Sequence, residues 1–389
     1  MENLNLDKSA WKRVKFGDVV VEPKETCRDI HAEGIEHVVG LEHIDSGDMH
    51  LRKSATTEES TTFTKKFRKG DVLFGRRRAY LKKAAQADFD GICSGDITVF
   101  RANKNLFPEL LPFIVNNDKF FDYAIKHSAG GLSPRVKFKD LANYEFLLPP
   151  KEEQAKLAEL LWAMDEVIER EKGVLEKSEI SKSAFIEGLL TGSIKLGKFE
   201  KPRQKYRLDE LAKYRRGSFP QPYGLQEWYD DINGSPFVQV FDIDYDLKLK
   251  DQTKVKISEK AKPMSVFVPK GTLIISIQGS IGRVAVTQYD AYVDRTILIF
   301  QNFLKEIDFM YFTYTIQRIF RIAEKTAPGA TIKTITKEAL NHFEINLPCI
   351  EEQKMIGERL SLLNKTVSEI KVKIESTLNL QKSIINQVF

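Results

Sequence analysis

The chain has 389 residues, of which 42% are hydrophobic and 30% are charged. One hydrophobic core rarely organises that length, so we expect two or three domains, and the apolar content argues against intrinsic disorder. The N-terminal segment has no apolar secretory signal, and no run approaches the roughly eighteen apolar residues of a membrane span, so we expect no membrane association and a cytoplasmic location. The three cysteines, Cys27, Cys93 and Cys349, form no CxxC pair, which excludes a disulfide framework and a zinc ribbon.

The net charge of +5 says little by itself, but its distribution along the chain is uneven. Residues 1–60 carry 8 Lys or Arg and 13 Asp or Glu, whereas residues 61–83 carry nine basic residues and one acid, Asp71. This segregation predicts a local positive face.

The first 150 residues read as mixed, strand-rich structure. Short apolar runs predict strands at 38–41, 71–74 and 97–100, and a helix follows at 110–123. The second half offers the same order, with strands at 237–241, 271–277 and 296–300 and a helix at 308–323. Residues 191–203, which contain Gly and Pro, are a plausible linker between the halves.

A repeat joins these two regions into a tandem duplication. Residues 138–157 (FKDLANYEFLLPPKEEQAKL) return within residues 336–356 (TKEALNHFEINLPCIEEQKMI) at a constant offset of 199, so that Phe138 corresponds to Lys337. Each copy ends in a Pro-containing strand end and a Glu-Glu pair, which suits the positive end of a helix dipole.

A heptad pattern continues from both copies in the same register and predicts two long helices. The two patterns are polar at matching positions, which favours packing of the two helices against each other along one common seam. Antiparallel pairing is favoured because each helix follows its own globular region. A surface helix covering a core is the alternative for either copy alone. The predicted seam residues are Leu157, Leu161, Met164, Ile168, Leu175, Phe185, Ile356, Leu360, Leu363, Val367, Ile370, Ile374 and Ile384.

Signatures of catalysis are missing from the sequence: there is no Walker A motif, GxGxxG, HExxH or GxSxG. His31, His37, His43 and His50 are spaced for neither a helical nor a strand metal site, so we predict no metal and expect partnered surface histidines. Cys93 precedes an apolar strand without a neighbouring His, so we expect a buried structural thiol. No catalytic residue is predicted.

Binding features are stronger. A turn, a strand and an arginine-rich loop carry most of the basic residues of the first half, and a second basic run contains Gly130, where backbone can approach a phosphate closely. Guanidinium groups pair with phosphates or with the O6/N7 edge of guanine, whereas a plain solvated face is the alternative. The candidate DNA-binding residues of the first half are Lys65, Lys66, Arg68, Arg76, Arg77, Arg78, Lys82, Lys83, Gly130, Arg135 and Lys137.

The second half has equivalents of both loops, in residues 278–283 and 328–333. Gln reads adenine and Arg reads guanine, so the halves are equipped for different bases. The candidates here are Arg215, Arg216, Gln278, Ser280, Arg283 and Lys333.

The double occurrence of Leu-Pro-x-x-Glu-Glu-Gln before a long heptad helix resembles the specificity subunit (HsdS) of type I restriction-modification systems, over essentially the whole chain. The segment 271–286 also resembles the family's recognition-domain pattern. The first half departs from that pattern, because Arg76, Arg77 and Arg78 stand where the family usually has small residues. The resemblance implies an α+β fold with two globular target recognition domains in tandem pseudo-repeat, joined by two long helices pairing as an antiparallel coiled coil.

We expect the first target recognition domain at 1–150, the first long helix and start of the linker at 151–196, the linker end and second recognition domain at 197–349, and the second long helix at 350–389. Each domain would read one half of a split DNA sequence, while the helix pair sets the spacer. Apolar residues outside the seam, such as Leu160, Trp162 and Val167, are candidates to dock methyltransferase subunits; contact with the neighbouring core is the alternative.

The partners that the resemblance implies are double-stranded DNA, two methyltransferase subunits and a motor-nuclease subunit. S-adenosylmethionine, ATP and Mg are expected on those partners, and no cofactor on this chain, which would be a non-catalytic subunit. Two other readings stay open: a stand-alone DNA-binding regulatory or structural protein without modification partners, and an enzyme that uses Cys93.

Overall fold

The computed structural model describes residues 7–56, 62–199, 201–244, 246–326, 334–336, 339–340 and 342–389. The chain divides into two compact units, Met1–Gly173 with Val372–Phe389, and Val174–Lys371. Each unit combines one globular domain with the start of one long helix and the end of the other. Lys333, one of the predicted DNA-binding residues, lies outside the described residues.

The first domain contains a four-stranded and a three-stranded sheet. The first has the order β2 (Val20–Val21), β8 (Ile97–Ala102), β5 (Val72–Gly75), β6 (Ala84–Gln86), with antiparallel neighbours throughout. The second has the order β3 (Val38–Val39), β7 (Gly91–Cys93), β4 (Lys65–Phe67). A separate ladder pairs β1 (Lys12–Lys15) with β9 (Glu145–Leu148).

Short helices complete the first domain: α1 (Phe16–Val19), α2 (Leu111–Val115), α3 (Asp118–Lys126) and α4 (Phe138–Leu141), with 3-10 turns at Leu41–His43, Ala79–Leu81 and Pro108–Leu110. The helix expected at 110–123 is split in two. Asn117 lies in an extended conformation before α3, and its side chain accepts a hydrogen bond from the Lys119 amide. An asparagine that caps a helix in this way starts a new helix and does not continue the old one.

The second domain repeats this topology. One sheet has the order β11 (Ala212–Arg216), β18 (Ile297–Phe303), β15 (Leu273–Ser276), β16 (Val284–Val286). The other has the order β13 (Val255–Ile257), β12 (Ser235–Val238), β17 (Ala291–Val293), β14 (Val266–Val268), and β10 (Gln204–Arg207) pairs with β19 (Glu344–Leu347). Strand β13, on the outer side of β12, extends this sheet relative to its counterpart in the first domain.

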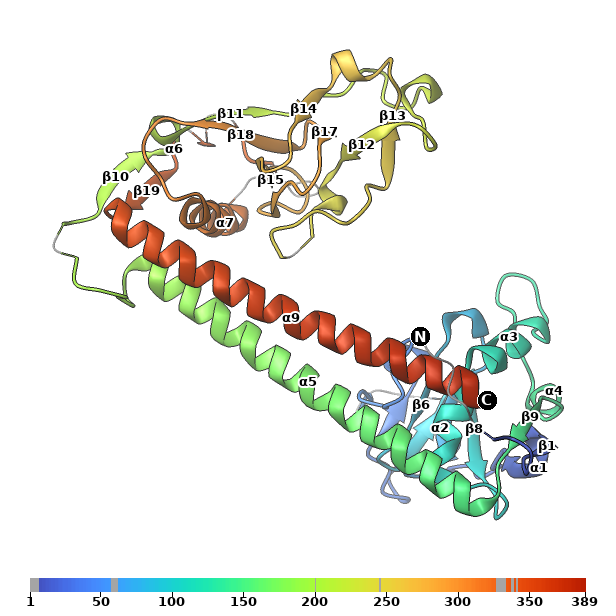
Figure 1. The fold of residues 1–389 in the computed structure, drawn as a ribbon. Coiled ribbons are helices and arrows are strands. Elements are labelled where there is room, and N and C mark those ends of the chain that lie inside the picture. Colours follow the sequence, from blue (N-terminus) through green and yellow to red (C-terminus); the bar gives the residue numbers. More distant parts are fainter. Residues whose placement is uncertain are drawn as a thin grey trace. The chain divides into compact units, whose positions relative to one another are not determined.

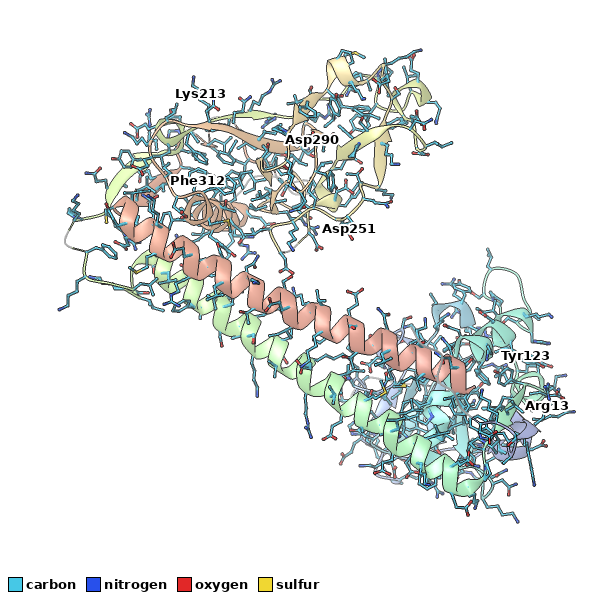
Figure 2. The ribbon with its side chains drawn as sticks, in the orientation of Figure 1. Arg13, Tyr123, Lys213, Asp251, Asp290 and Phe312 are labelled. Atoms are coloured by element: carbon cyan, nitrogen blue, oxygen red, sulfur yellow. The ribbon has the colours of Figure 1, made fainter. Side chains whose placement is uncertain are left out.

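Helix α7 (Phe309–Thr326) covers the inner face of the sheet that contains β11 and β18. The short helix α6 (Leu208–Leu211) lies between β10 and β11 in the chain. The 3-10 turns of this domain are Gln226–Trp228, Val240–Asp242 and Lys262–Met264. Phe312 of α7 is fully buried, with its ring centroid 5.4 Å from that of Phe300 in β18, whereas Lys213 on β11 points outward (Figure 2). This contrast follows the expected division between an apolar inner and a polar outer face.

Two long helices, α5 (Lys151–Thr191) and α9 (Ile350–Val388), start where the repeated motif predicts helices (Figure 1, green and red). In the first unit, Gln381 Nε2 donates to the Leu161 carbonyl oxygen at 3.3 Å and Lys373 Nζ lies 2.5 Å from Glu171 Oε1. Residue numbers rise along one helix as they fall along the other, so this pairing is antiparallel.

The second unit shows the same direction of pairing. Lys371 Nζ lies 3.0 Å from Glu179 Oε1, and Lys182 donates to the side chain of Asn364. The C-terminal end of α9 packs into the core of the first domain through Ile385 and Phe389, and the end of α5 packs into the core of the second through Leu189. Each helix therefore begins on its own domain and ends in the other unit.

The predicted seam residues are all at least half-buried. Buried are Leu161, Ile168, Ile356, Leu360, Val367, Ile374 and Ile384, and half-buried are Leu157, Met164, Leu175, Phe185, Leu363 and Ile370. In the described part of the chain, no helix is both long and apolar enough for a membrane crossing.

Candidate nucleic-acid interface

Two loops of the first domain form one surface. We call residues 76–83 the arginine loop and residues 128–137 the glycine loop. A β-bridge joins Arg77 to Arg135, the Val136 amide donates to the Arg76 carbonyl at 3.0 Å, and the Arg78 amide donates to the Pro134 carbonyl at 2.8 Å. The two basic segments, about fifty residues apart in sequence, are therefore held side by side by backbone hydrogen bonds.

Gly130 makes the turn of the glycine loop possible. Its φ of +118° lies in a region that residues with a Cβ rarely adopt. The loop then returns through Leu132, which is almost fully exposed, to Arg135. The turn brings Ala129 and Arg135 into mutual backbone hydrogen bonds of 2.9 Å.

Asp96, which precedes β8, binds both loops. Its carboxylate accepts a hydrogen bond from Arg135 Nε at 2.7 Å and another from Arg77 Nη1 at 3.2 Å. These arginines, Arg135 first, hold the pKa of Asp96 below its ordinary value. Arg77 Nη2 also donates to Ser133 Oγ at 3.2 Å. We did not anticipate Asp96 from the sequence; the only signal was an acid at the start of a strand between two basic segments.

The other arginine-loop residues differ in accessibility. Arg78 is exposed, with a left-handed φ of 55°, and its side chain makes no hydrogen bond or ion pair with the described residues. Arg76 is half-buried, and its Nε is buried with no hydrogen-bond partner among the residues that the structure describes. Lys137, at the N-cap position of α4, is exposed. Arg78 and Lys137 are therefore open to solvent, whereas Arg135 is exposed but bound to Asp96.

The two lysines of the arginine loop make contacts with other residues of the first domain. Lys82 Nζ lies 2.6 Å from Asp118 Oδ1, and Lys83 Nζ donates to the Leu41 carbonyl at 2.7 Å. Asp118 also accepts from Asn386 of α9 at 2.9 Å. Lys82 thus links the loop to the end of the long helix.

The basic strand β4 is neutralised by the acidic segment that precedes it in sequence. Lys65 Nζ donates to the Ile97 carbonyl at 2.7 Å and lies 3.3 Å from Glu22. Lys66 pairs with Glu33, and Arg68 Nη2 lies 2.8 Å from Glu25. The charge segregation seen in the sequence therefore does not persist in space here, because the two segments pack against each other.

The second domain builds the same loop pairing with other side chains. Gln278 forms a β-bridge with Thr334, and the Ile335 amide donates to the Ile277 carbonyl at 2.8 Å. Ser280 is exposed beside Gly279, whose φ is +74°.

Three arginines of the second domain lie on neighbouring segments. Arg216 Nη2 donates to the Ile335 carbonyl at 3.1 Å, and Arg215, beside it on β11, is exposed. Arg283 is half-buried, and its Nη1 donates to the Ile243 carbonyl at 3.3 Å. Arg216 is therefore hydrogen-bonded to the backbone at Ile335, whereas Arg283 is hydrogen-bonded to the backbone at Ile243.

Three of the four histidines considered as a metal cluster have individual partners, whereas the side chain of His31 has none among the described residues. His37 Nδ1 lies 2.9 Å from Ser54 Oγ, His43 Nδ1 accepts the Gly40 amide at 2.9 Å, and His50 Nε2 lies 2.7 Å from Asp165 Oδ2. Within the described ranges no group of three or more His, Cys, Asp or Glu side chains is placed to hold a metal ion.

Cys93 is fully buried in β7, and burial raises the pKa of its thiol to about 12. A thiol with that pKa is protonated at neutral pH and is a poor nucleophile. Its position fits the expected structural role.

The repeated Glu-Glu-Gln motif is explained by hydrogen bonds that the sequence did not predict. Gln154 Nε2 donates to the Pro149 carbonyl at 3.0 Å, and its Oε1 accepts the Phe107 amide at 2.8 Å. Gln353 repeats both bonds, to the Pro348 carbonyl at 2.9 Å and from the Asp308 amide at 3.1 Å. Each buried glutamine ties the start of a long helix to the strand end before it.

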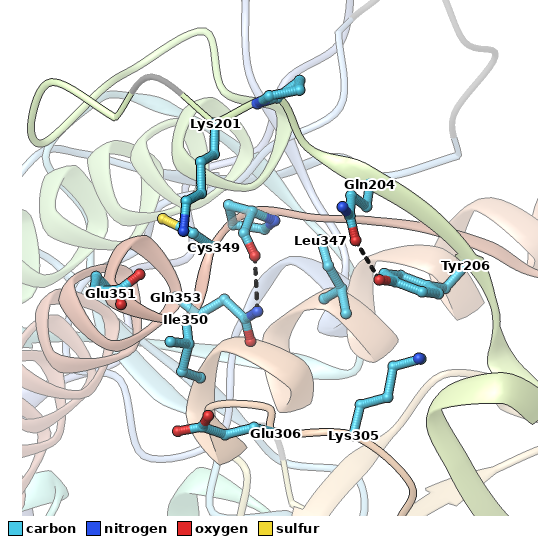
Figure 3. A pocket seen from close by; sticks show the side chains of 12 residues that line it. Lys201, Gln204, Tyr206, Lys305, Glu306, Leu347, Cys349, Ile350, Glu351 and Gln353 are labelled. Carbon is cyan, nitrogen blue, oxygen red and sulfur yellow. Dashed lines mark hydrogen bonds between the residues drawn. The ribbon is translucent and has the colours of Figure 1, made fainter.

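The second glutamate of each motif anchors the helix start to the beginning of its domain. Glu153 accepts from Trp11 Nε1 at 2.8 Å, and Glu352 accepts from Arg203 at 2.7 Å. Beside Gln353 lies a pocket of about 280 Å³ lined by Lys201, Tyr206, Lys305, Glu306 and Cys349 among others (Figure 3). Its position beside the strand end and the helix start makes it part of this junction.

Comparisons with known proteins agree with the duplicated architecture. The family model for the type I restriction modification DNA specificity domain matches residues 8–179 and again residues 200–380. A chain from Methanocaldococcus jannaschii assigned as the type I restriction enzyme MjaX specificity subunit is 24% identical over 82% of this chain and 77% of its own. The type I restriction enzyme EcoDI specificity subunit of Escherichia coli is 29% identical over 29% of this chain and 26% of its own.

Two solved structures share the fold. A chain from a structure on complex assembly and conformational transition of the type I restriction-modification system has a TM-score of 0.61 and 23% identity, covering 100% of this chain and 97% of that one. The S subunit of a type I restriction-modification system from M. genitalium has a TM-score of 0.60 and 13% identity, covering 100% and 99%.

Proposed function

Since the chain belongs to the family of type I restriction modification DNA specificity domains, we propose that it is the DNA-recognition subunit of a type I restriction-modification complex, with each domain reading one half of a split DNA sequence. The observation that carries this proposal is the paired-loop surface that recurs in both domains. In the first domain the loop after strand β5 is bridged to Arg135, and in the second the loop after strand β15 is bridged to Thr334.

The side chains on this surface differ between the domains, which is what reading two different half-sites requires. In the first domain Arg78, Arg135 and Lys137 stand at the rim of the paired loops. In the second, Gln278 and Ser280 take their place. Arginine donates twice to guanine and glutamine pairs with adenine, so the domains select different bases.

The remaining predicted residues have supporting roles in the proposal. Long-range attraction to phosphates comes from exposed cations, including Arg215, Arg216 and Lys137. Arg77, Lys82 and Lys83 hold the loops in place through the hydrogen bonds described above. Lys65, Lys66 and Arg68 are paired with acids, so their contribution to DNA affinity is expected to be small.

The chemistry is assigned to other subunits. We propose that two methyltransferase subunits supply S-adenosylmethionine-dependent methylation and that a motor-nuclease subunit supplies ATP- and Mg-dependent cleavage, in the cytoplasm. Leu160 and Val167, exposed on α5, are candidates to dock a methyltransferase subunit. Trp162 is no longer a good candidate, because its Nε1 donates to the Glu109 carbonyl at 2.8 Å and its ring packs on Phe113.

Mapping of methylated adenines across the host genome, with and without this gene, tests the proposal. We expect methylation of a split sequence that disappears with the gene. A methylation pattern that does not depend on the gene would contradict it.

The alternative is a stand-alone DNA-binding regulator that uses the same loops. Purification of the chain from its host separates the two functions. A methyltransferase that copurifies in stoichiometric amount supports the modification complex, and DNA binding without such a partner supports the regulator.

A further inference from the structure

Arg135 is held more firmly than any other exposed arginine of the paired loops. Its backbone amide and carbonyl both bond to Ala129 at 2.9 Å, and it forms a bridge with Arg77. Its Nε donates to Asp96 at 2.7 Å, and its side chain is still 45% exposed. The backbone and the inner edge of the guanidinium are therefore fixed, whereas its two terminal nitrogens make no hydrogen bond with the described residues.

From this geometry we propose that Arg135 determines the specificity of the first domain by donating from its two terminal nitrogens to a guanine, and that Asp96 is the positioning residue that aims it. The inference rests on the proposed function and names the base that this surface reads. A guanidinium bound through Nε keeps a free outer edge with two parallel donors, which matches the O6 and N7 acceptors of guanine in the major groove.

The carboxylate of Asp96 favours a base over a phosphate as the target. Asp96 pairs with both Arg77 and Arg135, so two positive charges share one negative charge directly behind the donors. A phosphate approaching Arg135 would meet a cation that is already partly neutralised and a carboxylate that repels it. A guanine edge carries no net charge and needs only correctly placed donors. The partial neutralisation of Arg135 by Asp96 therefore weakens binding to guanine little.

Neighbouring arginines are less suited to this task. Arg77 uses Nη1 for Asp96 and Nη2 for Ser133, and its Nε is buried with no hydrogen-bond partner among the described residues, so it has no free pair of terminal nitrogens to offer a base. Arg78 is exposed, and no side chain in the described part of the chain orients it, which suits a phosphate contact.

The second domain has a different arrangement at the corresponding positions. The repeat places Thr334 where the first domain has Arg135, and Thr296 where it has Asp96; Thr296 donates to Asp294. The carboxylate–arginine pair is thus a property of the first domain. Only one half-site is expected to depend on it.

The test uses the full chain and a pool of duplexes with randomised sequence, from which bound molecules are selected and sequenced. In Arg135→Lys, which keeps the charge but loses the two parallel donors, we expect the preference for G at one position of one half-site to fall on the order of 10- to 100-fold. The other half-site should remain fully selected, which also shows that the variant is folded. Asp96→Asn should relax the same position to a lesser degree.

Asp88→Asn is the matched control for Asp96→Asn, since Asp88 is exposed in the same domain and the charge change is identical. The double variant should be no less selective than Arg135→Lys alone, because Asp96 affects the guanine contact through Arg135. The salt dependence of binding by Arg135→Lys should match that of the unaltered chain.

Two outcomes would overturn the inference. One is an unchanged base preference at every position in Arg135→Lys. The other is a uniform loss of affinity in Arg135→Ala with a shallower salt dependence, which would identify a phosphate contact. If the unaltered chain selects no sequence at all, the proposed function itself fails, so the two failures are distinguishable.

Discussion

His50 and Asp165 form a hydrogen-bonded pair between the first domain and the helix α5, with 2.7 Å between Nε2 and Oδ2. Asp165 is buried, and the His50 ring packs edge-on against Trp162. Beside this pair, Arg52 bridges Asp48 at 2.6 Å and Glu169 at 2.8 Å. The loop that carries His50 is therefore fastened to the helix by charged groups.

The pair predicts a pH-dependent stability of the first unit. The hydrogen bond to Asp165 raises the pKa of His50 above its ordinary value of 6.5, although burial and the nearby Arg52 oppose the shift. The stabilisation is therefore fully present below about pH 6.5 and is lost as the pH rises through the higher pKa of the folded state. Compared with His50→Gln, the unaltered chain should lose up to about 1 kcal/mol of its free energy of unfolding over this range.

Chemical denaturation at a series of pH values measures this difference. His31→Gln is the control, since His31 is exposed and its side chain has no partner among the described residues. A His50→Gln variant whose stability follows pH in parallel with the unaltered chain would disprove the coupling.

Leu160 and Leu161 give a matched test of the two faces of α5. Leu161 is fully buried in the first unit, whereas Leu160 is 46% exposed. Leu161→Ala should lower the free energy of unfolding by about 2–5 kcal/mol, because it leaves a cavity in a packed core. Leu160→Ala should change it by less than about 0.5 kcal/mol but weaken binding of the methyltransferase subunit. Denaturation and pull-down measurements on both variants should give opposite results; equal destabilisation would mean that α5 has no free face at this point.

The glutamines of the repeated motif predict a local effect on each helix start. Gln154→Ala leaves the Pro149 carbonyl and the Phe107 amide without their partner in a buried site, at a cost of about 1–3 kcal/mol. Hydrogen exchange should accelerate at Phe107 in this variant and at Asp308 in Gln353→Ala. Gln252→Ala, at an exposed position, should leave both amides unchanged. Acceleration at neither amide would contradict the role that we assign to the motif.

The sequence predicted the features that repeat and missed those that depend on contacts between distant segments. The offset of 199 residues located both long helices, because a heptad pattern is local and its period is that of the helix. The ion pairs of Lys65, Lys66 and Arg68 with preceding acids could not be predicted, since charge along a sequence does not determine which side chains meet. Asp96 was missed for the same reason: its role appears only when two loops converge on it.

Cysteine reactivity tests the assignment of Cys93 to the core. With a thiol pKa raised to about 12 by burial, Cys93 should resist alkylation at pH 7 in the folded chain and react only after unfolding. Cys349, which is partly exposed, serves as the internal reference. Cys93→Ala should keep full DNA binding and methylation; a loss of methylation with intact DNA binding would favour an enzyme that uses this thiol.

The two long helices lead to a prediction about spacing. We expect that the helix pair sets the distance between the half-sites, so one heptad inserted into both helices should lengthen the unread spacer. Insertions after Gly173 in α5 and after Lys371 in α9 fall at the boundaries of the two units and leave the contacts within each unit intact. Seven residues add about 10 Å of helix, which corresponds to roughly three base pairs. Methylation mapping of the variant should show both half-sites unchanged in sequence with a longer spacer.

An insertion into α5 alone breaks the register of the seam and should abolish methylation. An unchanged spacer in the double insertion would show that the helices do not set the distance.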